Sequence, residues 1–156
     1  MNISDKSKLH IREAEEHEAA ILSELAIQSK AYWGYGKRFL EDCIEALTVK
    51  KDYISSTPVF VLEVEWKVVG FFAFYEEETW SLDFFFIKSD FIGKGFGKVM
   101  WEGALQIARD LGITSFKIDS DPYAKDFYEK MGAVHIGSIP STVWEGRRLP
   151  LMKVDI

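Results

Sequence analysis

Apolar residues recur along the N-terminal third of the chain first with the spacing of a strand and then with that of helices. Segment 8–12, Lys-Leu-His-Ile-Arg, predicts a short strand and precedes a helical pattern over 14–30, in which alanine and leucine residues share one face. Two glycines interrupt segment 31–36, and a second helical pattern follows over 38–49. This part of the sequence therefore predicts one strand followed by two helices.

A block rich in valine and phenylalanine follows Pro58 and predicts antiparallel strands. The runs at 59–64 and 68–75 flank three residues, 65–67, which predicts a hairpin. A third strand is predicted over 79–87. We expect these strands to form the antiparallel part of a central sheet.

Strands and helices alternate through the rest of the chain. The predicted elements are a helix that begins after 93–97 and ends at Gly112, a strand over 113–119, a short helix over 124–131, and strands over 134–139 and 149–154. The fold class predicted is α/β (α+β), a mixed and mainly antiparallel central sheet flanked by helices. The length favours a single domain over residues 1–156.

Charge and hydropathy exclude several classes of function. The 19 Lys and Arg against 25 Asp and Glu give a net charge of −6, and the chain lacks the Lys/Arg runs typical of nucleic-acid binding. Residues 1–18 lack the apolar core of a secretory signal, and the longest apolar stretch, 68–75, is too short to cross a bilayer. We therefore expect a cytoplasmic protein that binds small molecules, with no nucleic-acid or membrane partner.

Cysteine and histidine usage gives no support for a metal site or a disulfide. Cys43 is the single cysteine, and the three histidines are widely scattered. Cys43 lies on the apolar face of a predicted helix, where a buried, unreactive thiol is favoured over an acyl-carrying nucleophile. We predict no metal site.

The segment 93–97, Gly-Lys-Gly-Phe-Gly, follows an apolar strand and opens an amphipathic helix. This glycine loop allows a ligand to approach the backbone, and the first N–H groups of a helix attract anions. Lys94 and Lys98 add positive charge. The loop lacks the Gly-Lys-Ser/Thr ending of a Walker A loop, and Lys98 replaces the third glycine of a dinucleotide fingerprint. From these residues alone, a phosphate site and a turn without a ligand both stay open.

Together with a second segment, the glycine loop resembles the GCN5-related N-acetyltransferase (GNAT) superfamily. That family has a loop of pattern R/Q-x-x-G-x-G/A after its fourth strand, and 92–97 is similar to it. It also has a short helix of N-x-x-A-x-x-F-Y-x-x-x-G-F/A character, which resembles the run from Asp121 through Ala124, Phe127 and Tyr128 to Gly132. The order of predicted elements agrees as well, so the resemblance covers nearly the whole chain.

The resemblance implies an N-acetyltransferase that uses acetyl-CoA as co-substrate. The loop amides would bind the pyrophosphate of acetyl-CoA, and the fourth strand, splayed from the fifth, would hold the pantetheine arm. A backbone N–H at Phe86 or Ile87 would polarise the thioester carbonyl. The cofactor-binding residues carried over are Phe85, Phe86, Ile87, Ile92, Gly93, Lys94, Gly95, Phe96, Gly97, Lys98, Asp121, Ala124 and Tyr128.

Two positions depart from the family pattern. Ile92 stands where Arg or Gln is usual, which removes one polar side chain from the phosphates. Asp121 stands where Asn is frequent, which changes a contact with acetyl-CoA. Because the loop binds mainly through its main chain, we expect these changes to weaken the site without abolishing it.

Tyr128 and Asp83 are the catalytic candidates. Tyr128 matches the general acid of the family, which protonates the leaving sulfur; the alternative is a core tyrosine that anchors the short helix. Asp83 lies in the strand 79–87, where strict alternation places it on one face with Phe85 and Ile87. It is either a base that acts through water, or a solvated or lysine-paired carboxylate.

The acceptor is expected to be the primary amine of a small molecule, attacked directly in a ternary complex, with a protein or peptide amine as the alternative. Trp33 and Tyr35 lie in the region that shapes the acceptor pocket in relatives, where they either contact the substrate or pack a helix corner. Acidic runs at 13–18 and 76–78 are compatible with a cationic acceptor. A non-catalytic acyl-CoA-binding module is the second function class. Segment 139–148 is expected to border either the acceptor pocket or the interface of a homodimer.

Overall fold

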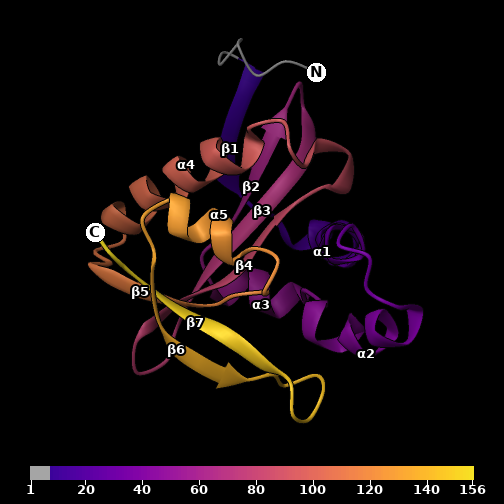
Figure 1. Ribbon diagram of the computed structural model, residues 1–156. Helices are drawn as coiled ribbons and strands as arrows, with labels where there is room; N and C mark the ends of the chain where they lie inside the picture. The colour runs from indigo at the N-terminus through magenta and orange to yellow at the C-terminus, as the bar shows by residue number, and fades with distance from the viewer. Residues whose placement is uncertain (1–7) are drawn as a thin grey trace.

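Seven strands form one mixed sheet in the computed structural model, which describes residues 8–156 (Figure 1). They are β1 (Leu9–Glu13), β2 (Val59–Val64), β3 (Lys67–Glu76), β4 (Trp80–Ile87), β5 (Ser115–Asp119), β6 (Val134–Pro140) and β7 (Arg148–Asp155). Their order across the sheet is β1-β2-β3-β4-β5-β7-β6, and only β4 and β5 are parallel neighbours within this described range. The predicted mixed, mainly antiparallel sheet is confirmed.

Helices cover both faces of this sheet. They are α1 (Ala19–Ala31), α2 (Lys37–Leu47), α3 (Lys51–Ser56), α4 (Phe96–Asp110) and α5 (Lys125–Lys130), with 3-10 turns at Glu16–Glu18 and Ser89–Phe91. Figure 1 shows α1, α2 and α3 on one side and α4 and α5 on the other. The sequence analysis missed α3, because a helix of 6 residues has too few positions to show a period.

Each face of the sheet has its own hydrophobic core. Successive residues of a strand point to opposite faces, so Phe71 packs under α1 while Phe72 packs under α4. Trp101 of α4 is 1% exposed and fills the core under α4. This helix was predicted to end at Gly112; it ends at Asp110, and the Leu111 side chain that follows is 42% exposed.

A β-bulge interrupts β4 beside the centre of the sheet. Ala73 of β3 pairs with Phe84, and the next residue, Phe74, pairs with Leu82. Asp83 is therefore an extra residue in β4 with no partner in β3. A bulge of this kind redirects a side chain and bends its strand.

The bulge makes the strict alternation predicted for Asp83 wrong. Phe85 and Ile87 pack into the core under α4 and α5. Asp83 instead accepts a hydrogen bond from Tyr53 of α3, on the other side of the sheet, with 2.6 Å between the oxygens. The extra residue shifts Asp83 out of the pattern that its neighbours follow.

The β4–β5 pair opens into a fork. In the described part of the chain the two strands are in register at one position, Ser81 with Lys117. Beyond it they diverge toward their C-terminal ends, which confirms the splayed pair predicted from the sequence. Crevices at the C-terminal ends of parallel strands are common ligand sites.

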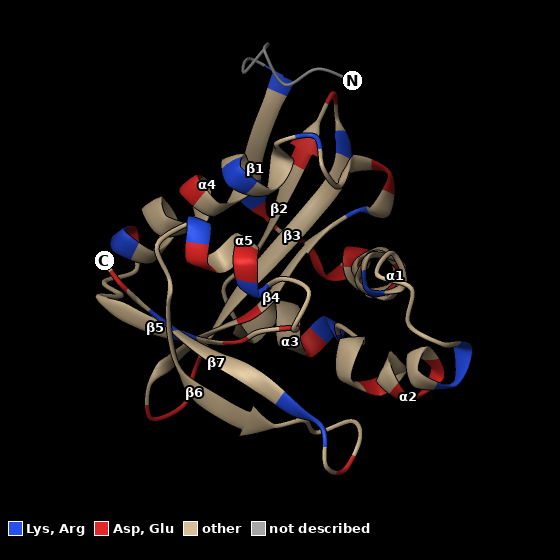
Figure 2. Ribbon diagram, viewed as in Figure 1, with Lys and Arg blue, Asp and Glu red and all other residues tan. Residues whose placement is uncertain are grey.

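Charged residues of both signs are interspersed along the ribbon (Figure 2). None of the helices in the described range 8–156 combines the length and apolar character needed to cross a membrane. One member of the acidic run 13–18, Glu18, is buried and accepts two 2.9 Å hydrogen bonds from the guanidinium of Arg12.

Candidate active site

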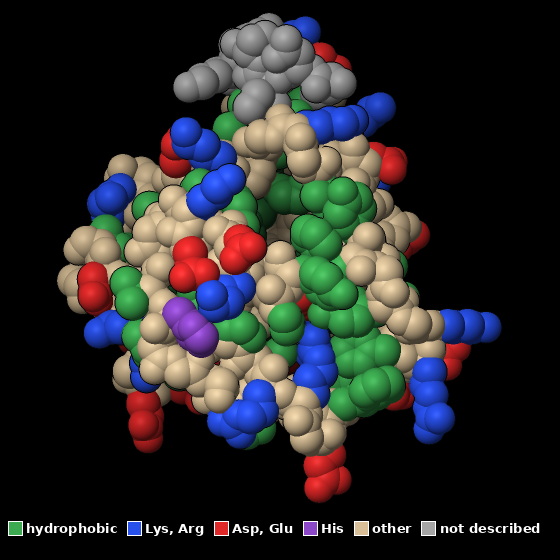
Figure 3. Space-filling view, viewed as in Figure 1, with side chains coloured by type: hydrophobic (Ala, Val, Ile, Leu, Met, Phe, Trp, Pro, Cys, Tyr) green, Lys and Arg blue, Asp and Glu red, His purple; other side chains and the backbone are tan. Residues whose placement is uncertain are grey.

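A cavity of about 660 Å³ lies at the fork between β4 and β5. It extends from the glycine loop, which we call its loop end, to a wall formed by Lys30, Trp33, Asp121 and Tyr123, which we call its α1 end. Figure 3 shows a band of hydrophobic side chains beside a hollow, between the side of the molecule with α1 and the side with α4 and α5. The size and the apolar walls suit a small-molecule site.

The three glycines of the loop contribute main-chain atoms to the wall of the cavity. Gly93, Gly95 and Gly97 all line it, and Gly95 caps α4 with a φ of 88°, a left-handed conformation that favours glycine. The first intrahelical bond runs from the N–H of Val99 to the carbonyl of Gly95 at 3.4 Å. The N–H groups of the preceding helical residues therefore have no acceptor within α4, and they present the positive end of its dipole.

Other residues of the loop differ in where their side chains lie. Phe96 is fully buried in the core under α4 and does not line the cavity. Lys98 and Ile92 line the cavity, and Ile92 also packs against the core under α4. Lys94 lies with its Nζ 5.9 Å from the centre of the Phe91 ring, outside the cavity lining.

Gly97 has a second reason to be glycine. A Cβ atom at this position would lie 3.2 Å from the ring of Phe127. Because Phe127 belongs to α5, the missing side chain allows the start of α4 to pack closely against that helix. This contact could not be seen in the loop motif alone.

The edge of β4 presents unpaired backbone groups to the fork. The N–H of Lys88 donates to the carbonyl of Val69 at 2.7 Å, and bonded and non-bonded pairs alternate from there along the β3–β4 ladder. This alternation directs the N–H of Phe86 toward β3 and the N–H groups of Phe85 and Ile87 toward the fork. Of the two donors considered from the sequence, Ile87 has the required direction and Phe86 does not.

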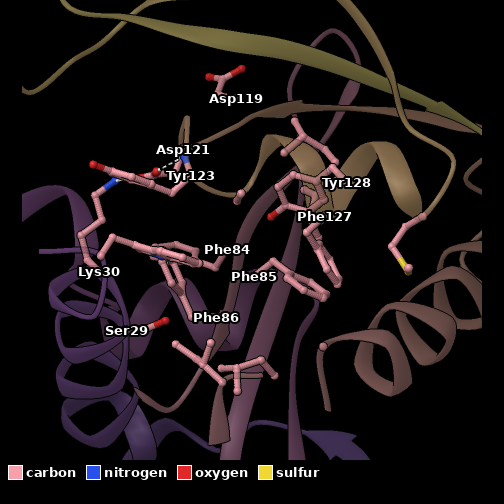
Figure 4. A pocket seen from close by; sticks show the side chains of 18 of the residues that line it. Ser29, Lys30, Phe84, Phe85, Phe86, Asp119, Asp121, Tyr123, Phe127 and Tyr128 are labelled. Atoms are coloured by element: carbon pink, nitrogen blue, oxygen red, sulfur yellow. Dashed lines mark hydrogen bonds and ion pairs between the residues drawn. The ribbon is translucent and has the colours of Figure 1, made fainter. Parts of the chain in front are cut away.

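Tyr128 reaches the cavity from α5. It is 6% exposed and packs against Phe85, Trp101 and Phe127. Its hydroxyl points into the cavity (Figure 4), and no described residue forms a hydrogen bond with it. Burial, and next the negative charge of Asp121, raise the pKa of Tyr128, so the phenol stays protonated at neutral pH.

Two carboxylates stand at the fork. Asp83 and Asp119 each lie two residues beyond the paired position of their strands, and both line the cavity. Partial burial and the charge of Asp83 raise the pKa of Asp119, while Lys117 lowers it. Burial and the bond to Asp83 raise the pKa of Tyr53. The sequence analysis missed Asp119, although it is the carboxylate that ends a strand just before the matched segment.

Asp121 is the centre of a side-chain cluster at the α1 end. Its carboxylate accepts hydrogen bonds from the Nζ of Lys30 at 2.5 Å, from the hydroxyl of Tyr35 at 2.9 Å, and from the N–H of Tyr123 at 2.8 Å. Arg147 donates to the Tyr35 hydroxyl at 2.9 Å. Burial and the Asp121 charge raise the pKa of Tyr35. Asp121 was predicted to contact acetyl-CoA, and here protein donors already occupy both of its oxygens.

Aromatic rings form the outer wall of the α1 end. Trp33 and Tyr123 stack with an interplanar angle of 1° and 5.5 Å between ring centres. Both line the cavity, which is where the sequence analysis expected Trp33. Tyr35 lies behind this wall, in the Asp121 cluster. Ala124, the next residue after Tyr123, also lines the cavity.

Cys43, which the sequence analysis did not expect to react, does not line the cavity. Cys43 is 2% exposed, and burial raises the pKa of its thiol, which agrees with the prediction of a buried cysteine. Within residues 8–156, no three His, Cys, Asp or Glu side chains are grouped as metal ligands would be.

Comparison with known families matches residues 13–154 to the family described as Acetyltransferase (GNAT) domain. Comparison with curated proteins gives no match. The match spans every strand from the end of β1 to β7 and therefore includes the glycine loop, the fork and α5.

Solved structures share the fold at low sequence identity. The GCN5-related N-acetyltransferase of Rhodopseudomonas palustris is 17% identical, with a TM-score of 0.78 over 94% of this chain and 95% of that one. PaiA N-acetyltransferase of Thermoplasma acidophilum, in complex with coenzyme A, is 17% identical, with a TM-score of 0.76 over 95% and 99%. YncA of Salmonella typhimurium, with its cofactor acetyl-CoA, is 19% identical, with a TM-score of 0.67 over 95% and 94%.

Proposed function

Because the chain belongs to the GNAT acetyltransferase family, we propose that it transfers an acetyl group from acetyl-CoA to the primary amine of a small molecule. Both substrates occupy the cavity together, and the amine attacks the thioester directly. The observation that carries this proposal is the hydroxyl of Tyr128, which is buried, protonated and without a partner among the described residues. It points into a cavity that joins the glycine loop to the α1 end.

The loop end suits the co-substrate acetyl-CoA. A pyrophosphate needs several N–H donors and positive potential, and the start of α4 offers both, with Lys98 alongside. The fork beside it exposes the backbone edge of β4, to which the amide-containing pantetheine arm can hydrogen-bond. The relatives solved with coenzyme A and with acetyl-CoA support this placement.

Two protons leave the acceptor nitrogen in the proposed reaction. The ammonium gives the first proton, through water, to the carboxylate pair Asp83 and Asp119. The raised pKa of Asp119 suits this carboxylate to accept the proton. The neutral amine then forms the C–N bond at the thioester carbon, and the N–H of Ile87 stabilises the charge that develops on the carbonyl oxygen.

Tyr128 acts as the general acid that protonates the leaving thiolate. When the C–S bond breaks, the sulfur takes the phenolic proton, and the second proton from the nitrogen restores the phenol. The products are the N-acetylated amine, the thiol of CoA and one proton released to solvent. Tyr128 and Asp83 approach the fork from opposite sides of the sheet, which separates the acid from the base.

A small acceptor is favoured by how the α1 end is closed. The loop between β6 and β7 is joined to α2 by a 2.6 Å hydrogen bond from the indole N–H of Trp144 to Asp42. Arg147 of the same loop bonds to Tyr35 between α1 and α2. These contacts hold the β6–β7 loop beside the α1 end, where it leaves less room for an extended protein segment to reach the cavity.

An amine panel tests the proposal. The purified protein is mixed with acetyl-CoA and single amino acids, amino-acid amides, alkylamines, polyamines or lysine peptides, and free thiol and acetylated product are measured. We expect amine-dependent thiol release, with the acetyl group on nitrogen. Tight CoA binding with no transfer to any amine would instead indicate the non-catalytic acyl-CoA-binding module.

A further inference from the structure

Positive charge exceeds negative charge in the Asp121 cluster. Lys30 lies 2.5 Å and Arg147 lies 3.9 Å from the same carboxylate. The side chains of these two cations are only 13% and 20% exposed. Asp121 can balance one of them, so one positive charge remains at the α1 end of the cavity.

Hydrogen-bond donors are also in excess there. An ammonium has three N–H donors and a guanidinium has five. Among the described residues, Asp121 accepts from Lys30, and the Tyr35 hydroxyl accepts from Arg147. Partly buried charged donors are stabilised by an oxygen acceptor, and a ligand in the cavity can supply one to Lys30.

Ser29 gives an independent sign of a polar ligand. It precedes Lys30 at the end of α1, is 5% exposed, and lines the cavity. Its hydroxyl points into the cavity (Figure 4), where it is open to a ligand. A serine hydroxyl can donate and accept, so it offers a hydrogen bond to a polar ligand atom beside Lys30.

We propose that the acceptor is an amine that also carries a carboxylate, such as an amino acid, and that Lys30 binds this carboxylate with Arg147 adding charge behind it. The inference rests on the proposed function and deepens it. The carboxylate faces Lys30 and Ser29, the flat wall of Trp33 and Tyr123 contacts the side chain, and the amine faces the fork.

The charges of the cavity agree with such an orientation. Positive charge lies at the α1 end, and the carboxylates Asp83 and Asp119 lie at the fork. The acidic runs 13–18 and 76–78, considered from the sequence as signs of a cationic acceptor, do not line this cavity. An acceptor with both charges matches the walls better than a simple cation.

Pairs of amino acids and their amides test the proposal directly. L-methionine, L-phenylalanine and β-alanine are each compared with the corresponding amide, in wild type, Lys30→Met and the control Lys37→Met. Lys37 is exposed at the start of α2 and lies outside the cavity. In the wild type we expect kcat/KM for at least one acid to exceed that of its amide by about tenfold or more, the size of one charged hydrogen bond.

The variants should separate recognition from folding and from CoA binding. Lys30→Met should abolish the preference by raising KM for the acid, Lys30→Arg should restore part of it, and Lys37→Met should match the wild type. The CoA Kd should stay unchanged in all three. Equal or better transfer to the amides, or a preference that survives Lys30→Met, would overturn the inference while leaving the acetyltransferase proposal intact.

A binding measurement covers the case in which no amine is acetylated, which would refute the proposed function. Calorimetry with the CoA-saturated protein and the same acid and amide probes reports recognition without turnover. Tighter binding of an acid, lost in Lys30→Met, would support the carboxylate site by itself. Equal binding of acid and amide, or no binding of either, would overturn it.

Discussion

The loop end and the α1 end of the cavity are built from different kinds of interaction. At the loop end, the surface consists of glycine backbone and unpaired amides at the start of α4. At the α1 end, side chains distant in sequence are joined by charge and hydrogen bonds, such as Lys30 with Asp121, 91 positions apart, and Arg147 with Tyr35, 112 apart. One end is defined by main-chain conformation, and the other by pairs of side chains.

This difference matches the two tasks that we propose for the cavity, holding acetyl-CoA and holding the acceptor. A main-chain site holds the same ligand as long as the backbone keeps its shape, so it suits a co-substrate shared by a whole family. A side-chain cluster changes its preference when one residue changes, so it suits an acceptor that differs between relatives. Substitutions at the loop end should therefore change the Kd for CoA, and substitutions at the α1 end should change the KM for the acceptor.

The largest effect is expected at Gly95. Valine there would strain a backbone with a φ of 88° and place methyl groups where the loop meets the cavity. Losing one or two charge-assisted hydrogen bonds to the pyrophosphate should weaken CoA binding by about 10- to 1,000-fold. Calorimetric titration with CoA measures this change.

Gly112 provides the matched control. It has a φ of 78° after the end of α4 and lies outside the cavity, so Gly112→Val imposes similar strain without touching the ligand. Both variants should lose thermal stability, and only Gly95→Val should lose CoA affinity. Equal CoA affinity in the two variants would remove the loop from the binding site.

A smaller effect is expected from Asp121→Asn. The amide keeps an acceptor for the N–H of Tyr123 but removes the charge that faces Lys30 and Arg147. We expect a loss of about 1.5–3 kcal/mol in the free energy of unfolding, because hydrogen bonds to charged groups are worth about that much. Chemical denaturation measures the loss.

The same variant decides to which end Asp121 belongs. If it serves the α1 end, the CoA Kd should change little while KM for the acceptor changes. The family pattern, which has Asn here, implies instead a contact with the co-substrate. Tighter CoA binding by Asp121→Asn would support that contact and contradict our assignment of Asp121 to the acceptor end.

The sequence was sufficient to predict the fold class and the position of the glycine loop at the start of a helix. Strand and helix periods, Gly93 to Gly97 and the Phe127-Tyr128 pair lie in short segments whose chemistry can be recognised locally. The bulge at Asp83 was not predictable in this way, because it arises where β3 and β4 come into register. One extra residue there changed the side of the sheet on which a candidate catalytic carboxylate lies.

The α1 end could not be derived from local patterns. Lys30 belongs to an ordinary helix, Arg147 to a polar loop, and Asp121 looked like a variant of a cofactor contact. Only the folded chain brings them within hydrogen-bond distance or ion-pair reach. Ser29 likewise carries no signal in sequence, since its importance comes from its place in the cavity wall, with its hydroxyl pointing inward.

The measurement that tests the central claim most directly is kcat for Tyr128→Phe beside its Kd for acetyl-CoA. The ring and its packing are kept, and only the hydroxyl that points into the cavity is lost. General acids contribute about 10²–10⁴-fold, so we predict that kcat falls at least about tenfold while the Kd and the melting temperature stay close to wild type. A folded Tyr128→Phe protein with undiminished kcat would contradict the account.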